Sequence, residues 1–99
     1  VVGIHYTAAK AGILGMTLKY AKYLAPYSVT VNSILPGPID TAFHAETPAE
    51  QKKKIAGIIP VGRWGQPDEV AAAVFFLASE KAAFITGENL DINGGIIMD

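Results

Sequence analysis

Val29-Thr30-Val31-Asn32-Ser33-Ile34-Leu35 is the stretch of this sequence that decides the fold. Its short apolar, β-branched run is typical of a parallel strand that is buried on both faces. Pro36-Gly37-Pro38 then ends the strand abruptly. Because ligands bind at the carboxyl ends of strands in open α/β sheets, this turn is a candidate binding site. Asn32 is the one amide inside the strand, and we expect it to make structural hydrogen bonds.

A long helix is expected before this strand, over residues 6–25, because good helix formers dominate there and Pro26 follows. Apolar residues at spacings of three and four predict a buried stripe along it. The stripe comprises Leu14, Leu18, Ala21 and Ala25. Gly12 and Gly15 each cost a helix about 1 kcal/mol relative to Ala. We therefore expect another backbone, from a sheet or a subunit, to approach them closely.

Two more helices and a second strand are expected after the turn. Thr47-Pro48-Ala49-Glu50 has the form of a capping box and predicts a short helix from Pro48 to about Ile58. Pro67-Asp68-Glu69 opens the next helix, whose apolar face is wide enough to be core. A strand over residues 89–92 and a turn at Gly94-Gly95 follow. The order helix, strand, helix, helix, strand indicates part of an α/β sheet.

The composition excludes several classes of function. The 99 residues form at most one domain, and a net charge of −1 lacks the basic footprint of a nucleic-acid-binding protein. No apolar run reaches about 18 residues, so we expect no membrane span. Cysteine is absent and no signal peptide is visible, which together favour a reducing, cytoplasmic location.

Tyr6 and Lys10 are the candidate catalytic residues. They stand four positions apart in the expected long helix, so their side chains lie on one face, one turn from each other. An ammonium close to a phenol favours the phenolate and so lowers the pKa of a phenol. Such a phenol can give a proton to a carbonyl oxygen or take one from an alcohol. The same pair on an ordinary solvated helix has no function, so the flanking sequence must decide.

Six motifs of the flanking sequence occur together in a fixed order. They are Tyr6-Thr7-Ala8-Ala9-Lys10-Ala11-Gly12, Val29-Thr30-Val31-Asn32-Ser33-Ile34-Leu35-Pro36-Gly37, Pro36-Gly37-Pro38-Ile39-Asp40-Thr41, Gly62-Arg63-Trp64-Gly65-Gln66-Pro67-Asp68-Glu69-Val70-Ala71, Phe76-Leu77-Ala78-Ser79 and Ile85-Thr86-Gly87. The set resembles the short-chain dehydrogenase/reductase family, and in particular the subfamily that includes 3-oxoacyl-acyl-carrier-protein reductases. The resemblance implies a doubly wound, Rossmann-like parallel sheet in a three-layer α/β/α domain. Residues 1–99 would be its C-terminal portion, with the nucleotide-binding half outside this chain.

The resemblance also implies a function, namely an oxidoreductase that uses NADP or NAD and acts on a small carbonyl or secondary alcohol. Tyr6 resembles the general acid/base, and Lys10 resembles the residue that holds the nicotinamide ribose. Pro36-Gly37 is similar to the turn beneath the nicotinamide, while Ile39 and Thr41 resemble the pair that meets the carboxamide. The implied cofactor-binding residues are therefore Tyr6, Lys10, Pro36, Gly37, Ile39 and Thr41.

Departures from the family pattern keep an alternative open. The Gly-rich phosphate loop and the catalytic serine of the family fall outside this chain, and Tyr27 stands where carrier-protein reductases often have a basic residue. The alternative is a non-catalytic chain that only folds with, or associates with, a sister chain. The small residues of the long helix and the apolar tail at residues 96–98 favour a homo-oligomer, a dimer or a tetramer.

Other conspicuous residues are expected to be structural. His44 with Glu46 supplies two ligands, too few for a metal site, so we expect no metal. Trp64 is expected to pack, and Lys52-Lys53-Lys54 to form a solvated helix face. The family pattern further assigns a bracing role, in the loop before the last helix, to Arg63, Pro67 and Glu69.

Overall fold

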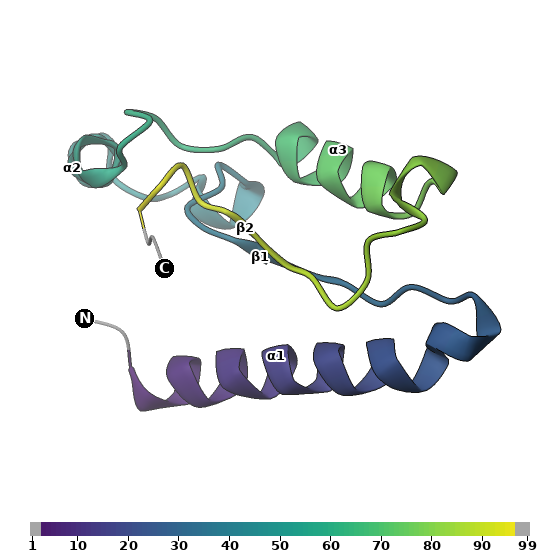
Figure 1. Ribbon diagram of the computed structural model, residues 1–99. Coiled ribbons are helices and arrows are strands. Elements are labelled where there is room, and N and C mark those ends of the chain that lie inside the picture. The colour runs from purple at the N-terminus through teal and green to yellow at the C-terminus, as the bar shows by residue number, and fades with distance from the viewer. Residues whose placement is uncertain (1–2, 97–99) are drawn as a thin grey trace. The chain divides into compact units, whose positions relative to one another are not determined.

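The computed structural model describes residues 3–96, which divide into two compact units. One unit comprises residues 3–34 and 76–90, and the other comprises residues 35–75 and 91–96. The elements in order are α1 (Ile4–Leu24), the 3-10 helix η1 (Ala25–Tyr27), β1 (Ser33–Pro36), the 3-10 helix η2 (Ala42–His44), α2 (Ala49–Ile58), α3 (Pro67–Leu77), the 3-10 helix η3 (Glu80–Ala82) and β2 (Asn89–Ile92) (Figure 1). This order confirms the predicted succession of helices and strands.

β1 and β2 pair as a two-stranded sheet (Figure 1). The amide of Ser33 donates to the carbonyl of Glu88 at 2.9 Å, and the amide of Gly37 donates to the carbonyl of Ile92 at 2.8 Å. The residue numbers rise together along the two strands, from Ser33 with Glu88 to Gly37 with Ile92, so the strands are parallel. A parallel pair needs a long crossover, which α2 and α3 provide. The α/β class is therefore confirmed, while the full doubly wound sheet and its three layers stay a prediction.

The predicted first strand is wrong at its start, since β1 begins at Ser33 rather than at Val29. Ahead of β1, a side chain replaces part of the regular ladder. Asn32 donates from Nδ2 to the carbonyl of Ile85 at 3.2 Å, and its Oδ1 accepts from the amide of Glu88 at 3.0 Å. These two bonds confirm the structural role predicted for Asn32, and they take up backbone groups that a longer ladder would have paired.

The burial predicted for this strand is also wrong. Residues 33–35 are half-buried and Pro36 is exposed. The reason is that the sheet has two strands within residues 3–96, so each strand pairs along one edge only. A strand covered on both faces would need neighbouring strands and helices beyond those described here.

In the first unit, α1 packs through a narrower stripe than predicted. Ala21 and Thr17 are buried, whereas Leu18 is 50% exposed and Ala25, in η1, is exposed. Burial of Thr17 was not predicted, and it is possible because its hydroxyl donates to the carbonyl four residues earlier at 2.7 Å. A Cβ added at Gly87 would lie 3.6 Å from the Cβ of Ala21, so the segment before β2 rests on the helix at this point.

One packing prediction stays a prediction and another is wrong for the described residues. A Cβ added at Gly12 or Gly15 would meet nothing within 4 Å, so no backbone of residues 3–96 approaches the helix closely there, and the expected neighbour, a sheet or a subunit, stays a prediction. No residue of α3 is buried, and Phe75 and Phe76 are 78% and 44% exposed. The apolar face of α3 is therefore not core in the part of the chain that the structure describes.

The second unit has Ile59 and Trp64 as its buried residues. The short helix predicted here is confirmed as α2, but its capping box is wrong, because Pro48 is the N-cap and no side chain caps the helix. Thr47 belongs instead to the preceding turn, where its amide donates to the carbonyl of His44 at 3.1 Å.

The end of the described chain contains the predicted glycine turn. Gly94 and Gly95 have φ angles of 62° and 88°, which confirms the turn after β2. The apolar tail beyond Ile96 lies outside the described residues. Within residues 3–96, no helix is both long enough and apolar enough to cross a membrane.

Candidate active site

Tyr6 and Lys10 both lie in α1, in the first unit. The helix runs without interruption from Ile4, so the two side chains share one face, one turn apart, as predicted. The amide and the hydroxyl of Thr7 both donate to the carbonyl of Gly3, at 3.1 and 3.2 Å, which holds the first turn together. Tyr6 is 50% exposed, so its phenol is accessible, whereas Lys10 is half-buried.

A surface hollow in the second unit lies at the carboxyl end of β1. It is lined by Pro36, Gly37, Ile39, Thr41, Phe43, His44, Pro67 and Val70. The four predicted cofactor-binding residues outside α1 are all among them, so the structure brings these four together. Because β1 ends at Pro36, the hollow has the position at which α/β sheets bind ligands.

Gly37, which lines this hollow, lies where the chain after β2 passes closely. Its amide donates to the carbonyl of Ile92 at 2.8 Å, which brings the two backbones together. A Cβ added at Gly37 would stand 2.6 Å from the Cβ and 2.8 Å from the Cα of Asn93, closer than atoms can approach. Glycine is therefore required here by the close passage of the chain that follows β2.

Ile39 is held by an isolated parallel bridge to Gly65. The amide of Asp40 donates to the carbonyl of Gly65 at 2.8 Å, and the amide of Gly65 donates to the carbonyl of Pro38 at 2.9 Å. Gly65 thus bonds to Pro38 and Asp40, the two neighbours of Ile39. In a parallel bridge of this pattern, the N–H and C=O of the middle residue point away from the partner strand. The backbone donor and acceptor of Ile39 are therefore directed away from Gly65.

Sequence reasoning did not assign four residues of the hollow to cofactor binding, namely Phe43, His44, Pro67 and Val70. The rings of Phe43 and His44 meet edge to face with centroids 5.1 Å apart, and His44 also meets Trp64 edge to face at 4.9 Å. The aromatic pair Phe43-His44, separated from Thr41 by one alanine, was the available signal. His44 is thus a packing residue, and no group of three or more potential metal ligands gathers within residues 3–96.

Trp64 is buried, and its Nε1 donates to the carbonyl of Lys52 at 2.9 Å, so the predicted packing role is confirmed. The prediction for Lys52 is wrong. Its ammonium lies 2.8 Å from Oδ1 of Asp40 and 5.3 Å from the centroid of the Trp64 ring. Lys53 and Lys54 are exposed, as expected of a solvated face.

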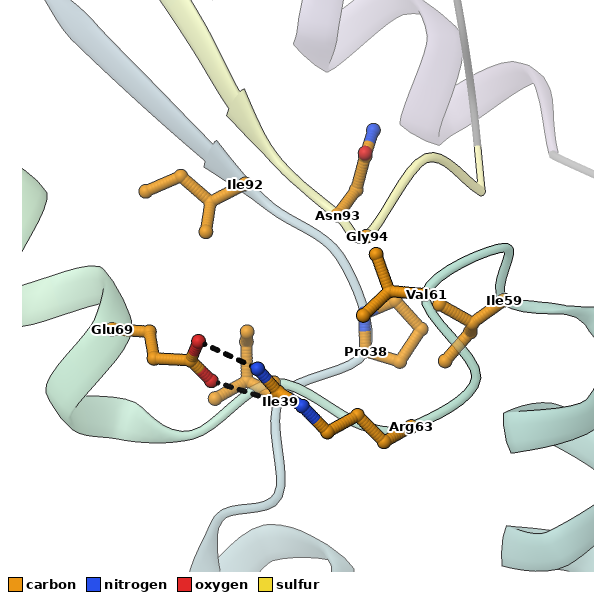
Figure 2. Close-up of a pocket in the computed structure, with 10 residues that line it drawn as sticks. Pro38, Ile39, Ile59, Val61, Arg63, Glu69, Ile92, Asn93 and Gly94 are labelled. Carbon is orange, nitrogen blue, oxygen red and sulfur yellow. Dashed lines mark hydrogen bonds and ion pairs between the residues drawn. The ribbon is translucent and has the colours of Figure 1, made fainter.

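A smaller cavity of about 110 Å³ lies near the hollow in the same unit (Figure 2). It is lined by Pro38, Ile39, Ile59, Val61, Arg63, Gly65, Glu69, Ile92, Asn93 and Gly94. A water molecule occupies about 30 Å³ of the liquid, so this cavity holds a few waters at most. It is too small for a nucleotide, and the hollow at the end of β1 is the better candidate site.

Arg63 and Glu69 form the brace that was predicted for the loop before α3. Figure 2 shows the guanidinium of Arg63 facing the carboxylate of Glu69, with bonds of 2.8 and 2.9 Å. Glu69 also accepts from the amide of Gln66 at 2.9 Å. The hydrogen bond from Arg63, followed by that from Gln66, lowers the pKa of Glu69 to about 2. Glu69 in turn raises the pKa of Arg63 through the same hydrogen bonds, so both members of the pair stay charged over the whole ordinary pH range.

The candidate residues therefore fall into two groups, each placed in its own unit. Tyr6 and Lys10 form the first group on α1, and the lining of the hollow forms the second. The first group offers a proton donor beside a cation, and the second offers a backbone donor and acceptor with a hydroxyl nearby.

Known proteins match this chain along nearly all of its length. The family model described as enoyl-(acyl carrier protein) reductase matches residues 2–97. The 3-oxoacyl-[acyl-carrier-protein] reductase FabG of Aquifex aeolicus is 47% identical over 93 residues, which cover 94% of this chain and 38% of that protein. FabG of Vibrio cholerae is 47% identical over 94 residues, covering 95% and 38%. The (3R)-3-hydroxyacyl-CoA dehydrogenase of Canis lupus familiaris is 42% identical over 94 residues, covering 95% and 36%.

The chain thus spans between 36% and 38% of the length of these relatives. The match covers the helix with Tyr6 and Lys10, the turn after β1 and the braced loop before α3. The chain belongs to the short-chain dehydrogenase/reductase family.

Proposed function

We propose that these residues are the C-terminal portion of an oxidoreductase with a single Rossmann-like domain. The enzyme uses NADP or NAD and transfers a hydride between the nicotinamide and a carbonyl or secondary alcohol. The observation that carries this proposal is the gathering of Pro36, Gly37, Ile39 and Thr41 around one hollow at the end of β1. The names of the relatives support it, because one is a reductase of a 3-oxoacyl group and another a dehydrogenase of a 3-hydroxyacyl group.

The hollow has the chemistry that the nicotinamide end of such a cofactor requires. A carboxamide carries both a hydrogen-bond acceptor and two donors. The N–H and C=O of Ile39, which face away from Gly65, would pair with these groups, and the exposed Thr41 would add a hydroxyl. Pro36 and Gly37, which line the same hollow, would form the turn beneath the flat nicotinamide ring.

Tyr6 and Lys10 would handle the proton. When bound, the cofactor supplies or accepts the hydride at the reacting carbon. The phenol of Tyr6 donates its proton to the substrate oxygen during reduction and takes it back from the alcohol during oxidation. The ammonium of Lys10, one helical turn on, stabilises the phenolate that this transfer creates and holds the ribose of the cofactor.

The role of Tyr6 is tested in the complete protein by Tyr6→Phe, with Tyr23→Phe on the same helix as the matched control. Tyr23 is 70% exposed and lies more than four turns away from Tyr6, so its hydroxyl should have no part in the reaction. Loss of the proton donor should lower turnover by about 10²–10⁴-fold while leaving cofactor affinity intact. Unchanged turnover in Tyr6→Phe overturns the role of this residue.

The same measurements separate the enzyme from its alternative, a non-catalytic chain that only associates with a sister chain. The enzyme predicts that the complete wild-type protein binds a nicotinamide cofactor and reduces a carbonyl substrate. A complete protein that does neither, yet assembles with a sister chain, supports the alternative. The size of the assembly also tests the predicted dimer or tetramer.

A further inference from the structure

Lys52 of α2 is attached to its surroundings at two points. Its ammonium makes an ion pair with Asp40 at 2.8 Å and lies over the ring of Trp64, 5.3 Å from the centroid. Its backbone carbonyl accepts from Nε1 of Trp64 at 2.9 Å. Both the side chain and the main chain of one helical residue are therefore fixed by residues outside the helix.

These contacts close a ring within the second unit. Asp40 reaches Lys52 through its carboxylate, Lys52 reaches Trp64, and Gly65, the next residue, accepts from the amide of Asp40 at 2.8 Å. Trp64 is buried, so its side chain holds this closed set of contacts in place. Asp40 is thus anchored by its backbone on one side and by its side chain on the other.

The ring borders the hollow at the end of β1. Asp40 stands between Ile39 and Thr41, which both line the hollow. The segment 41–51 includes η2 and the first residues of α2, and the ion pair joins the residues that flank its two ends. This segment carries Phe43 and His44, which line the same hollow. The imidazole of His44 also packs edge to face against the indole of Trp64. One wall of the hollow is therefore held in place by the contacts of Asp40 and Lys52.

We propose that Asp40 and Lys52 are a positioning pair, which holds the wall formed by residues 41–44 in the shape that receives the nicotinamide end of the cofactor. This inference rests on the proposed function and goes beyond it, since neither residue need touch the cofactor. The side chains of Lys52 and Asp40 are 28% and 40% exposed. Solvent therefore screens the pair, and its loss should weaken cofactor binding moderately rather than abolish it.

The test uses the complete protein with Lys52→Gln, and Lys53→Gln as the matched control on the same helix. Lys53 is exposed, so its substitution removes one charge without opening the ring. Loss of the ion pair and of the cation over Trp64 should raise the KM and Kd for NADP or NAD about three- to tenfold. The kcat at saturating cofactor should change less than about twofold, because Tyr6 is untouched. Lys53→Gln should leave both constants unchanged.

Two further variants separate positioning from a general loss of stability. Lys52→Arg keeps a cation that can pair with Asp40 and should restore the cofactor KM to near the wild-type value. Asp40→Asn should raise the cofactor KM by no more than Lys52→Gln does, because it breaks the ion pair but leaves the cation near Trp64. The two changes together should cost no more than Lys52→Gln alone, because both break the same ion pair. If the increases in cofactor KM add in the double variant, or if Lys52→Arg fails to restore the KM, the ion pair is not what positions the wall, and the proposal is overturned.

Hydrogen exchange supplies a readout that does not depend on turnover. Amides of residues 42–51 should exchange faster in Lys52→Gln than in Lys53→Gln, because the segment 41–51 has lost the contact that joins its flanking residues. Faster exchange with an unchanged cofactor Kd means that the ring is structural only, and this result overturns the proposal. A wild-type protein that binds no nicotinamide cofactor at all instead refutes the proposed function, and with it the role of this pair. The two failures are thus distinguished by cofactor titration of the wild type.

Discussion

Arg63 and Glu69 meet in two parallel hydrogen bonds, from Nη1 to Oε1 at 2.8 Å and from Nη2 to Oε2 at 2.9 Å. Arg63 also donates to the carbonyl of Trp64 at 3.0 Å, and Glu69 accepts from the amide of Gln66. The pair therefore joins the end of the loop to the first turn of α3. Planar, two-pronged pairing of this kind fixes direction as well as distance.

Replacing Glu69 by Gln should lower the thermal stability of the protein in a pH-dependent way. The pKa of Glu69 in the folded chain is about 2, against an ordinary value of 4.5. A depressed carboxyl pKa contributes stability that is complete above pH 4.5 and is lost as the pH falls towards 2. The difference in Tm between wild type and Glu69→Gln should therefore be largest at neutral pH and shrink in acid.

Asp68→Asn is the matched control for this experiment, because Asp68 is the neighbouring acid in the same helical turn and lies outside the brace. The Tm difference between Asp68→Asn and wild type should not follow the pH dependence expected for Glu69→Gln. A Tm difference for Glu69→Gln that stays constant between pH 7 and pH 2.5 would contradict the account, since it would separate the brace from the charge of Glu69.

Gly37→Ala should destabilise the protein, because its new Cβ would stand 2.6 Å from the Cβ of Asn93 and 2.8 Å from the Cα. Part of the clash is with backbone, so the ends of β1 and β2 must move apart. We expect a loss of about 1–3 kcal/mol in the free energy of unfolding, measured by denaturant titration. A stability equal to wild type would mean that the two strands separate freely beyond Pro36.

Gly57→Ala provides the contrast to this clash. Gly57 lies inside α2, and a Cβ there would meet nothing within 4 Å among the described residues. The substitution should therefore stabilise the helix by about 0.5–1 kcal/mol, because Ala loses less conformational freedom on folding. Opposite signs for the two Gly-to-Ala changes show that close approach, rather than loss of glycine as such, decides the effect.

Asn32→Leu should also destabilise the protein, for a reason unrelated to size. Asn32 satisfies the carbonyl of Ile85 and the amide of Glu88, at 3.2 and 3.0 Å. Leucine would leave both backbone groups without that partner, at a cost of about 1–3 kcal/mol in the free energy of unfolding. Ser33→Ala, which removes a bond between two side chains at the same end of the sheet, should cost less. Equal costs would show that satisfying the backbone is not what Asn32 contributes.

The elements that the sequence predicted best have local boundary signals. α2 follows Pro48, α3 begins at Pro67, and a glycine turn ends β2, so nearest neighbours determine where each begins or ends. Burial was predicted worse because it depends on residues far away in the sequence. Phe75 has a large apolar side chain of the kind usually found in a core, yet it is 78% exposed among the described residues.

The candidate site divides in the same way. Pro36, Gly37, Ile39 and Thr41 were predictable because they follow one another directly after a strand. Pro67 and Val70 were not, since the bridge between Ile39 and Gly65 is what brings them to the hollow. Lys52 was assigned to solvent for a similar reason. Its partners Asp40 and Trp64 each lie 12 positions away, in opposite directions along the chain.

The last prediction concerns the 99 residues on their own. They contain the hollow and the pair on α1, but within residues 3–96 no Gly-rich loop leads from a strand into a helix. The glycine turn after β2 is followed by no helix up to Ile96, and the loop with Gly62 and Gly65 follows α2 rather than a strand. Helix N-termini behind such loops are where dinucleotides anchor their phosphates. The isolated chain should therefore bind NADP far more weakly than the complete protein and show no turnover. A nicotinamide fluorescence titration measures this directly, with the complete protein as the positive control. Micromolar binding by the isolated chain would contradict the prediction and would mean that the hollow alone supplies most of the binding free energy.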